Sequence, residues 1–143
     1  MDNNYWVLYA SHDEPKYLKD AGGGQRAQRE ASLRFVSSHR NALDIGSNIG
    51  QWTRPLAKIF DNVICFEPNP NFRECFSRNI NEPNVILHPY ALSSHEHTAE
   101  QGKPDTHLNH RVGDTNPRDG DIECKSLDSF NFAEIDYVKI DVD

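Results

Sequence analysis

Apolar residues recur along this chain at two different spacings. Runs rich in apolar residues, typical of buried strands, lie at residues 42–45, 63–67, 85–88 and 137–142. Between the first three runs, in residues 52–60 and 69–80, apolar residues instead recur at the spacing of one helix face. Strands that alternate with helices indicate a parallel sheet with right-handed crossovers. We therefore predict an α/β fold with a Rossmann-like open parallel sheet.

Helix boundaries carry their own signals. Asn69 followed by Pro70 is typical of a helix cap and a first-turn proline, so a helix begins there. Its predicted buried stripe comprises Phe72, Cys75, Phe76 and Ile80. Pro55 is compatible only with a first helical turn, so the helix before it begins near Trp52 or is kinked.

A further helix is predicted over residues 25–38, and we expect it to pack on the sheet. Its apolar stripe comprises Ala27, Ala31, Phe35 and Val36. Residues 1–24 form an N-terminal extension to a domain at 25–143, with residues 5–9 either a short strand or a cover for a core edge. Residues 95–120 are polar and predict a loop or loose hairpin, and residues 122–125 alternate weakly, like an edge strand.

The junction between the first two strands carries the candidate chemistry. The first strand leads into a loop with Gly46 and Gly50, and the second ends on Glu67, about 20 residues beyond the glycines, which is the spacing of a ribose-binding acid in a βαβ unit. Glycine lets the backbone turn sharply and approach a ligand, and an ionised Glu67 accepts both hydroxyl protons of a ribose. This arrangement predicts a nucleoside-cofactor site.

The glycine spacing favours one cofactor over another. A dinucleotide loop follows G-x-G-x-x-G, whereas this loop is D-x-G-x-x-x-G, with Ser47 and Asn48 where the dinucleotide pattern would place x and Gly. Asp44 beside the turn repels phosphate and suits a cation, such as the ammonium or sulfonium of S-adenosylmethionine. An NAD-type oxidoreductase is the weaker alternative, since the chain also lacks a Tyr-x-x-x-Lys catalytic pair.

Several segments together resemble the FkbM-type S-adenosylmethionine-dependent methyltransferases. The resemblance lies in Gln25-Arg26, ALDIGSNIGQW at 42–52, Phe60, VICFEPNP at 63–70, Asn84, HPYALSS at 88–94, the LDS at 127–129 and DYVKIDVD at 136–143. It implies a sheet of the class I methyltransferase type, and transfer of a methyl group to an oxygen of a small-molecule or glycan acceptor.

Each candidate residue has a predicted role in cofactor binding and an alternative, purely structural explanation. Gly46 and Gly50, with Asn48 between them, should border the methionine part of the cofactor, or they are turn residues only. Asp44 orients the amino group, directly or through water, or is a solvated loop acid. Glu67 holds the ribose, or is an exposed acid that caps the next helix.

The remaining candidates lie further along the strand ends. Pro68 and Asn69 should line the adenine side. Ala91 and Leu92 follow the third strand, where the family's adenine pocket lies, although structural packing explains them nearly as well. Asp141 follows the fourth strand at the edge where open α/β sheets bind ligands, so it faces either the methyl donor or the acceptor hydroxyl.

Composition excludes several classes of partner. The 143 residues carry 15 Lys and Arg against 22 Asp and Glu, a net charge of -7, which disfavours nucleic acid and anionic membranes. No apolar stretch reaches membrane-spanning length and no signal peptide is visible, so a cytoplasmic protein is expected. Cys65, Cys75 and Cys124 lack C-x-x-C spacing and read as small apolar residues.

The histidines form two tempting pairs. His95 with His97, and His107 with His110, have spacings that could share a metal ion, but no nearby acid or cysteine completes either pair. A solvated polar loop is the better reading, and no metal is expected. A histidine could also act as a general base for an acceptor hydroxyl, although the sequence supplies no partner to orient it.

The chain stops where the family continues with Glu-Gly and further strands. We expect this chain to contain the half-sheet that binds cofactor and to lack the C-terminal half that completes an acceptor pocket, so a non-catalytic nucleoside-binding module stays open as an alternative. The last strand would also be left with an open edge. We therefore expect a homodimer or higher assembly in which these strands meet, or in which the N-terminal aromatic segment around Trp6 of the same or another chain covers them.

Overall fold

The computed structural model describes residues 4–9, 12–18, 25–100 and 121–142. The strands of the main sheet are β3 (Asn41–Ile45), β4 (Asn62–Phe66), β5 (Val85–His88) and β9 (Ile135–Ile140), and the helices are α1 (Arg26–Leu33), α2 (Thr53–Leu56) and α3 (Pro70–Asn79). Two small sheets accompany them: β1 (Tyr5–Tyr9) with β2 (His12–Leu18), and β6 (Ala91–Leu92), β8 (Asp121–Lys125) and β7 (His97–Glu100). A 3-10 helix, η1 (Leu127–Phe130), precedes β9.

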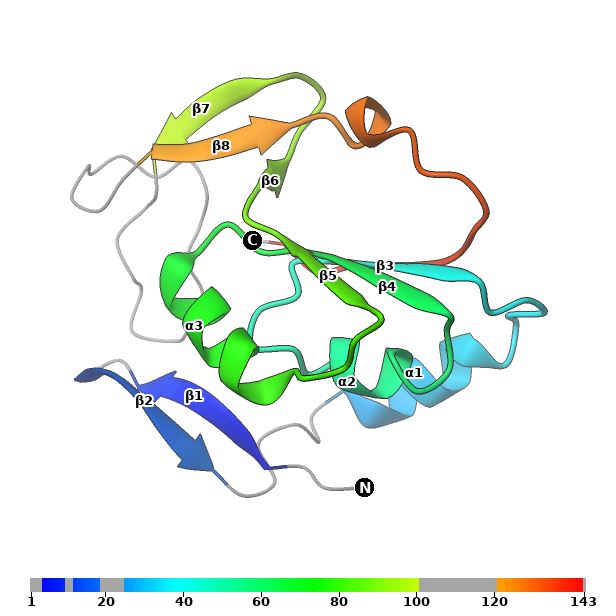
Figure 1. Ribbon diagram of the computed structural model, residues 1–143, viewed down its shortest axis with the longest axis horizontal. Helices are drawn as coiled ribbons and strands as arrows, with labels where there is room; N and C mark the ends of the chain where they lie inside the picture. Colours follow the sequence, from blue (N-terminus) through cyan, green and yellow to red (C-terminus); the bar gives the residue numbers. More distant parts are fainter. Residues whose placement is uncertain (1–3, 10–11, 19–24, 101–120, 143) are drawn as a thin grey trace.

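The main sheet has the order β5-β4-β3-β9, and its neighbouring strands are parallel. This is the order of the first four strands of a Rossmann sheet, counted 3-2-1-4. The three α-helices lie on one side of the sheet, and the β6-β8-β7 sheet with η1 lies on the other (Figure 1). The predicted α/β class with an open, Rossmann-like parallel sheet is confirmed.

Alternate residues of the central strands fill two cores. Ala42, Val63 and Cys65 are unexposed on the face that packs against α2 and α3. Leu43 and Phe66 lie on the opposite face and pack against a group of aromatic residues. These residues come from the end of β5, the turn before β6, the end of η1 and the segment after η1. That group comprises His88, Tyr90, Phe130 and Phe132. Burial on both faces explains why most residues of β3 and β4 are apolar.

The two helices that follow the glycine loop and β4 match their boundary signals. The Asn69 side chain accepts hydrogen bonds from the backbone N–H groups of Asn71 and Phe72, at 2.9 and 3.4 Å, and Pro70 opens α3. All four residues of the predicted α3 stripe are buried. Pro55 lies in the first turn of α2, which begins directly after Trp52, so the helix accommodates the proline without a kink.

The first helix is shorter than predicted, and three of the four residues of its predicted stripe are exposed. α1 ends at Leu33, so Phe35 no longer follows helical spacing and is 90% exposed. Ala27 and Ala31 are exposed as well, and the buried residue of the helix is Arg29. Val36, the fourth residue of the predicted stripe, does pack against the core, beside Leu33.

The strand at residues 122–125 is not an edge strand, so that prediction is wrong. It is part of β8, the middle strand of the separate three-stranded sheet. β8 pairs antiparallel with β7 and parallel with β6. Ile122 and Cys124 are buried there with Ala91, which explains the alternation. Most of the polar stretch between β7 and β8 lies outside the described residues.

The N-terminal strand packs on α3, away from β9. Tyr5 is buried against Ile49, Phe72 and Cys75. The Asn79 side chain accepts from the Trp6 backbone N–H at 2.7 Å and donates to the Trp6 carbonyl at 3.0 Å. Among the described residues, the segment around Trp6 therefore does not cover the open edge of the last strand of its own chain, and coverage by this segment of another chain stays a prediction. Residues 5–9 do form a strand, as one of the two readings proposed, with β2 as a partner that the sequence did not predict.

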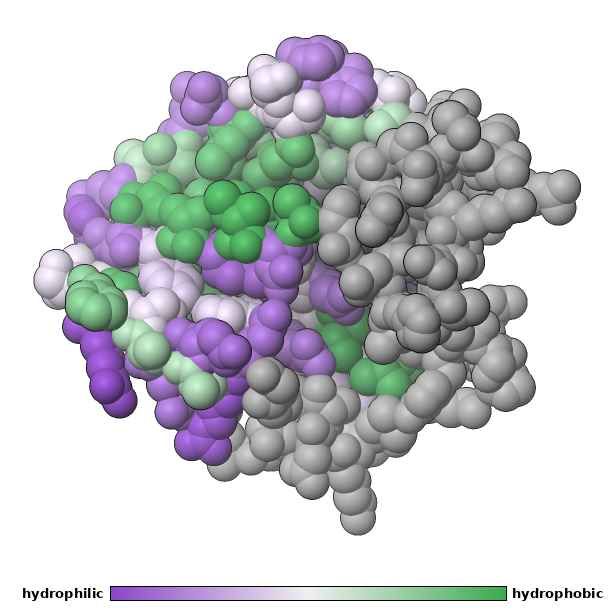
Figure 2. All heavy atoms as spheres, turned by 180° about the vertical axis from the view of Figure 1, so that it is seen from behind, coloured by the Kyte–Doolittle hydropathy of each residue, from purple (hydrophilic) through white to green (hydrophobic). Residues whose placement is uncertain are grey.

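The outer face of β9 is apolar and exposed. Among the described strands β9 pairs with β3 alone, so it forms one edge of the sheet. Val138, Ile140 and Val142 are 47%, 65% and 64% exposed. Seen from behind, hydrophobic side chains gather over the part of the surface where β9 lies (Figure 2).

Candidate functional site

The glycine loop connects the carboxyl end of β3 to α2, and its backbone requires glycine twice. Gly46 has a φ of +72° and Gly50 a φ of +90°. A Cβ on Gly46 would lie 2.1 Å from the Asp141 carbonyl oxygen, and one on Gly50 would lie 2.7 Å from the Ile80 side chain. The space that each glycine leaves is therefore filled by the protein itself, rather than kept open for a ligand as the sequence suggested. Their assignment to the methionine part of a cofactor stays a prediction.

Every backbone N–H of the loop has an acceptor within the protein. The N–H groups of Gly46 and Ser47 both donate to the Phe66 carbonyl at 3.0 Å, and that of Gly50 donates to the Ser47 carbonyl at 2.9 Å. The N–H of Asn48 donates to Glu67 Oε2 at 2.9 Å, and that of Ile49 donates to Asn48 Oδ1 at 2.8 Å. The loop is thus held in place by protein contacts and offers no row of free donors to a phosphate.

Glu67 joins the glycine loop to the start of α3. One carboxylate oxygen accepts from Asn48, and the other accepts from the Asn69 backbone N–H at 2.8 Å. The residue is 5% exposed, so it is not the exposed capping acid of the alternative explanation. Burial raises the pKa of its carboxyl group, and the two backbone donors oppose that rise. Each carboxylate oxygen has a second lone pair, so the capacity to accept ribose hydroxyls remains.

Asp44 differs from its expected place. It is a strand residue with no exposed surface, not a solvated loop acid. Its Oδ2 accepts from the Thr53 hydroxyl at 2.7 Å, and its Oδ1 lies 3.0 Å from Lys139 Nζ. Because Lys139 already neutralises this carboxylate inside the protein, Asp44 is not a free charge for a cationic ligand. These contacts join β3, α2 and β9, and the assignment of Asp44 to the amino group of a cofactor stays a prediction.

Lys139 is a site residue that the sequence reasoning missed. Besides the contact with Asp44, its ammonium group donates to the Gly46 carbonyl at 2.6 Å and to the Ile45 carbonyl at 3.4 Å. It therefore fixes the loop at the carboxyl end of β3. The signal in the sequence was a lysine between two apolar residues of a strand, Val138 and Ile140, because a buried cation needs a buried acid nearby.

Asp141 follows β9 and lies beside the glycine loop. Its backbone N–H donates to the Ile45 carbonyl at 3.1 Å, and its carbonyl occupies the space next to Gly46. Its carboxylate is exposed and accepts from Gln25 Nε2 at 3.1 Å. The structure thus brings Asp141, the loop and Glu67 together at the carboxyl ends of the parallel strands.

The predicted adenine side is built from the turn between β4 and α3. Asn69 is 2% exposed, and its side-chain Nδ2 is buried without a hydrogen-bond acceptor among the described residues. The Arg73 guanidinium donates to the carbonyls of Glu67 and Pro68, which fixes the turn. A buried donor without an acceptor is costly, so Asn69 Nδ2 is a natural contact for a ligand acceptor.

Ala91 and Leu92 form the short strand β6, which pairs with β8. Ala91 is 9% exposed and packs with Ile122 and Cys124, whereas Leu92 packs against the sheet face that carries Phe66. These contacts agree with the packing explanation for both residues. Their contact with an adenine stays a prediction.

The histidine and cysteine side chains give no further site. His95 and His97 stack at 4.6 Å and are exposed, and the described residues contain no group of three or more potential metal ligands. His107 and His110 lie outside the described residues. All three cysteines are free and buried, as predicted, and burial raises the pKa of their thiols, that of Cys75 to about 11.

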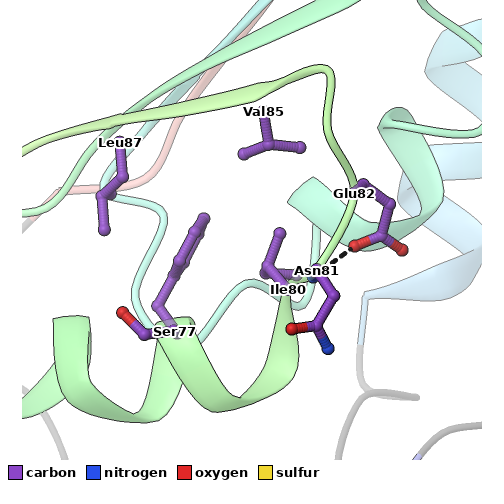
Figure 3. A pocket seen from close by; sticks show the side chains of 7 residues that line it. Ser77, Ile80, Asn81, Glu82, Val85 and Leu87 are labelled. Carbon is purple, nitrogen blue, oxygen red and sulfur yellow. Dashed lines mark hydrogen bonds between the residues drawn. The ribbon is translucent and has the colours of Figure 1, made fainter.

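An open groove of about 340 Å³ lies between α3 and β5, away from the strand ends. It is lined by Phe76, Ser77, Ile80, Asn81, Glu82, Val85 and Leu87 (Figure 3). None of the predicted site residues lines it. Phe76 and Ile80 belong both to the groove and to the surroundings of the glycine loop, because their side chains also occupy the space beside Gly50.

Comparison with known proteins finds similarity to solved structures only. No family model matches it, and no curated protein does. Among solved structures, it resembles methyltransferase FkbM from Methylobacillus flagellatus, with 13% identity, a TM-score of 0.49, and coverage of 73% of this chain and 26% of that one. It also resembles a phosphoethanolamine N-methyltransferase from Haemonchus contortus solved with S-adenosylhomocysteine, with 27% identity, a TM-score of 0.41, and coverage of 48% and 15%.

This chain spans between 15% and 32% of the length of the solved chains that it resembles. A similar fold does not by itself imply a shared function. Within the described residues, no helix is both long enough and apolar enough to cross a membrane.

Proposed function

We propose that this chain binds S-adenosylmethionine and is a methyltransferase or the cofactor-binding portion of one. The observation that carries the proposal is the contact between Glu67 and Asn48, which joins the acid at the end of β4 to the glycine loop at the end of β3. Ligands of open α/β sheets bind at this edge of the sheet. The FkbM-type motifs in the sequence support the same function.

The residues at this edge suit a cationic nucleoside. Glu67 would hold the ribose hydroxyls. Asn69 Nδ2, a buried donor that has no acceptor among the described residues, would donate to an acceptor atom on the adenine side. Asp141 is the exposed carboxylate beside the loop and would attract the ammonium or sulfonium group. When bound, S-adenosylmethionine supplies an electrophilic methyl group to an acceptor.

The loop favours this cofactor over NAD. A dinucleotide site offers free backbone N–H groups to a pyrophosphate at the start of a helix. Here all five N–H groups from Gly46 to Gly50 have acceptors in the protein, and one of those acceptors is the Glu67 carboxylate. A phosphate would have to displace these bonds and approach a buried acid.

The acceptor is proposed to be an oxygen of a small molecule or a glycan. This part of the proposal follows from the FkbM resemblance, and the net charge of -7 makes a polyanionic acceptor unfavourable. Asp141 is the candidate to face the acceptor hydroxyl if it does not contact the methyl donor. Its place beside the loop is compatible with either role.

Calorimetric titration with S-adenosylhomocysteine tests the cofactor. The folded chain should bind this ligand, and Glu67→Ala should weaken binding by about 1–3 kcal/mol, because the ribose loses its charged acceptor. Glu96→Ala, which removes an exposed acid away from the site, is the matched control and should bind like the wild type.

Two results would contradict the proposal. One is an absence of binding at millimolar ligand. The other is an equal loss of affinity in both variants, which would show that Glu67 is only a structural clamp. Binding of S-adenosylhomocysteine without methyl transfer to any of a panel of hydroxylated acceptors would favour the non-catalytic nucleoside-binding module, and tighter binding of NAD would favour the oxidoreductase.

A further inference from the structure

Gln25 connects two residues that are far from it in the sequence. It directly precedes α1, and its side-chain Nε2 donates to Asp141 Oδ2 at 3.1 Å. Its Oε1 accepts a hydrogen bond from the Trp52 indole N–H. One amide side chain therefore bridges the residue before α2 and the residue after β9.

The chemistry of the two neighbours fixes which way the amide faces. An indole N–H can only donate, and an ionised carboxylate can only accept. Gln25 satisfies both in a single orientation, with Oε1 toward Trp52 and Nε2 toward Asp141. The Arg29 guanidinium lies over the Trp52 ring, 5.6 Å from its centre, and helps to hold the indole in place.

The backbone of Asp141 is fixed by other contacts, so Gln25 acts on the side chain. The N–H of Asp141 is bonded to Ile45, and its carbonyl is packed against Gly46. The carboxylate itself is exposed, and Gln25 is the side chain for which the structure gives a hydrogen bond to it. Without that bond, the carboxylate would sample several rotamers beside the loop.

We infer that Gln25 is a positioning residue that holds the Asp141 carboxylate in one orientation beside the glycine loop. Trp52 sets the orientation of the amide and thereby the direction of its donor. The consequence for ligand affinity rests on the proposed function, because it requires Asp141 to face the cofactor. The bridge itself does not depend on any ligand.

Substitutions of Gln25 separate its two hydrogen bonds. Gln25→Glu has the same shape and still accepts from Trp52, but it presents a carboxylate to Asp141 instead of a donor. Gln25→Ala removes both bonds. Each variant should weaken S-adenosylmethionine binding by about tenfold, the ratio that one hydrogen bond to a charged group supports. Gln28→Ala, an exposed glutamine on the same helix, is the matched control and should leave affinity unchanged.

A nuclear magnetic resonance experiment on the ligand-free chain tests the bridge independently. The chain has two tryptophans, and Trp52→Phe assigns the Trp52 indole N–H signal. Asp141→Asn should shift this signal when Gln25 is present and leave it unchanged in a Gln25→Ala background. Such dependence reports transmission through Gln25, which simple loss of stability would not produce.

Two outcomes would overturn the inference. An indole signal that does not respond to Asp141→Asn would show that the bridge is absent in solution. Wild-type affinity in both Gln25 variants, beside a weakened Asp141→Asn variant, would show that Asp141 needs no orientation by Gln25. If the wild type binds no S-adenosylmethionine, the proposed function fails, and the indole signal alone then decides the bridge.

Discussion

At the scale of single residues, the Asp44 and Lys139 pair stabilises the region around the glycine loop. Lys139→Met should lower the free energy of unfolding by about 3–5 kcal/mol, because it leaves the buried Asp44 carboxylate without its cation. The double variant Asp44→Asn with Lys139→Met should regain part of that loss, since no charge remains buried. Urea denaturation measures both. A single variant no less stable than the double one would mean that the pair is not formed.

The two loop glycines should differ in their tolerance of a side chain. Gly46→Ala places its Cβ against the Asp141 backbone carbonyl, whereas Gly50→Ala meets the end of the Ile80 side chain, which can move. Both also strain a positive φ. We expect losses of more than about 3 kcal/mol at Gly46 and about 1–3 kcal/mol at Gly50. Thermal denaturation of the two alanine variants tests the order, and a reversed order would contradict the geometry.

Glu67 should give the protein a characteristic pH dependence. Burial places its folded-state pKa above the ordinary value of 4.5, so the folded state binds the proton more tightly than the unfolded chain does. Glu67 therefore contributes a loss of stability as pH rises from 4.5 through the folded-state pKa. The Glu67→Gln variant has no carboxyl group to titrate at this position, so it avoids this loss of stability. Its stability relative to the wild type should therefore increase from pH 4.5 to the folded-state pKa of Glu67 and then level off. Denaturation at a series of pH values measures the difference, and a change of the opposite sign would contradict the burial argument.

At the scale of elements, Asn79 ties the β1 strand to α3 and to the glycine loop. Its amide group bonds the Trp6 backbone on both sides and also donates to the Ile49 carbonyl at 2.8 Å. Asn79→Ala should lower the free energy of unfolding by about 1–3 kcal/mol and speed amide hydrogen exchange in β1. Exchange in β4 should change less. Unchanged protection in β1 would show that the packing of Tyr5 alone holds the hairpin.

The elements also show how far the sequence could predict the structure. The strands β3, β4 and β5 and the helix α3 were predictable, because local signals such as the Asn69 cap agree with the burial that the fold requires. α1 was mispredicted, because Phe35 continues the apolar spacing although the helix ends at Leu33. The assignment of β8 to a separate sheet depends on pairing with β6 and β7, which alternation along one strand cannot reveal.

In the candidate site, too, local features could be predicted from the sequence and distant contacts could not. The position of Glu67 followed from spacing along the chain, whereas the partners of Asp44 and Asp141 come from residues 95 and 116 positions away, in Lys139 and Gln25. Contacts at such separation leave no periodic signal in a single sequence.

At the scale of the whole molecule, we propose that the open edge of β9 pairs with β9 of a second copy. An antiparallel pairing centred on Ile140 would place the exposed Val138 opposite the exposed Val142, so apolar side chains would meet apolar partners. Sedimentation at micromolar concentration should show a dimer, and Ile140→Lys should dissociate it. Ile86→Lys, on the exposed face of the opposite edge strand β5, is the control. A monomeric wild type whose β9 amides exchange rapidly would contradict the assembly.

The hydrogen bonds within the glycine loop bear on how fast and how tightly a ligand binds. Because the loop N–H groups from Gly46 to Gly50 already have acceptors, the loop reaches its final conformation before a ligand arrives. Binding then immobilises little additional backbone and loses little conformational entropy there. Association at this loop should therefore be a single kinetic step, with a rate proportional to ligand concentration and no plateau from a slow rearrangement of the loop.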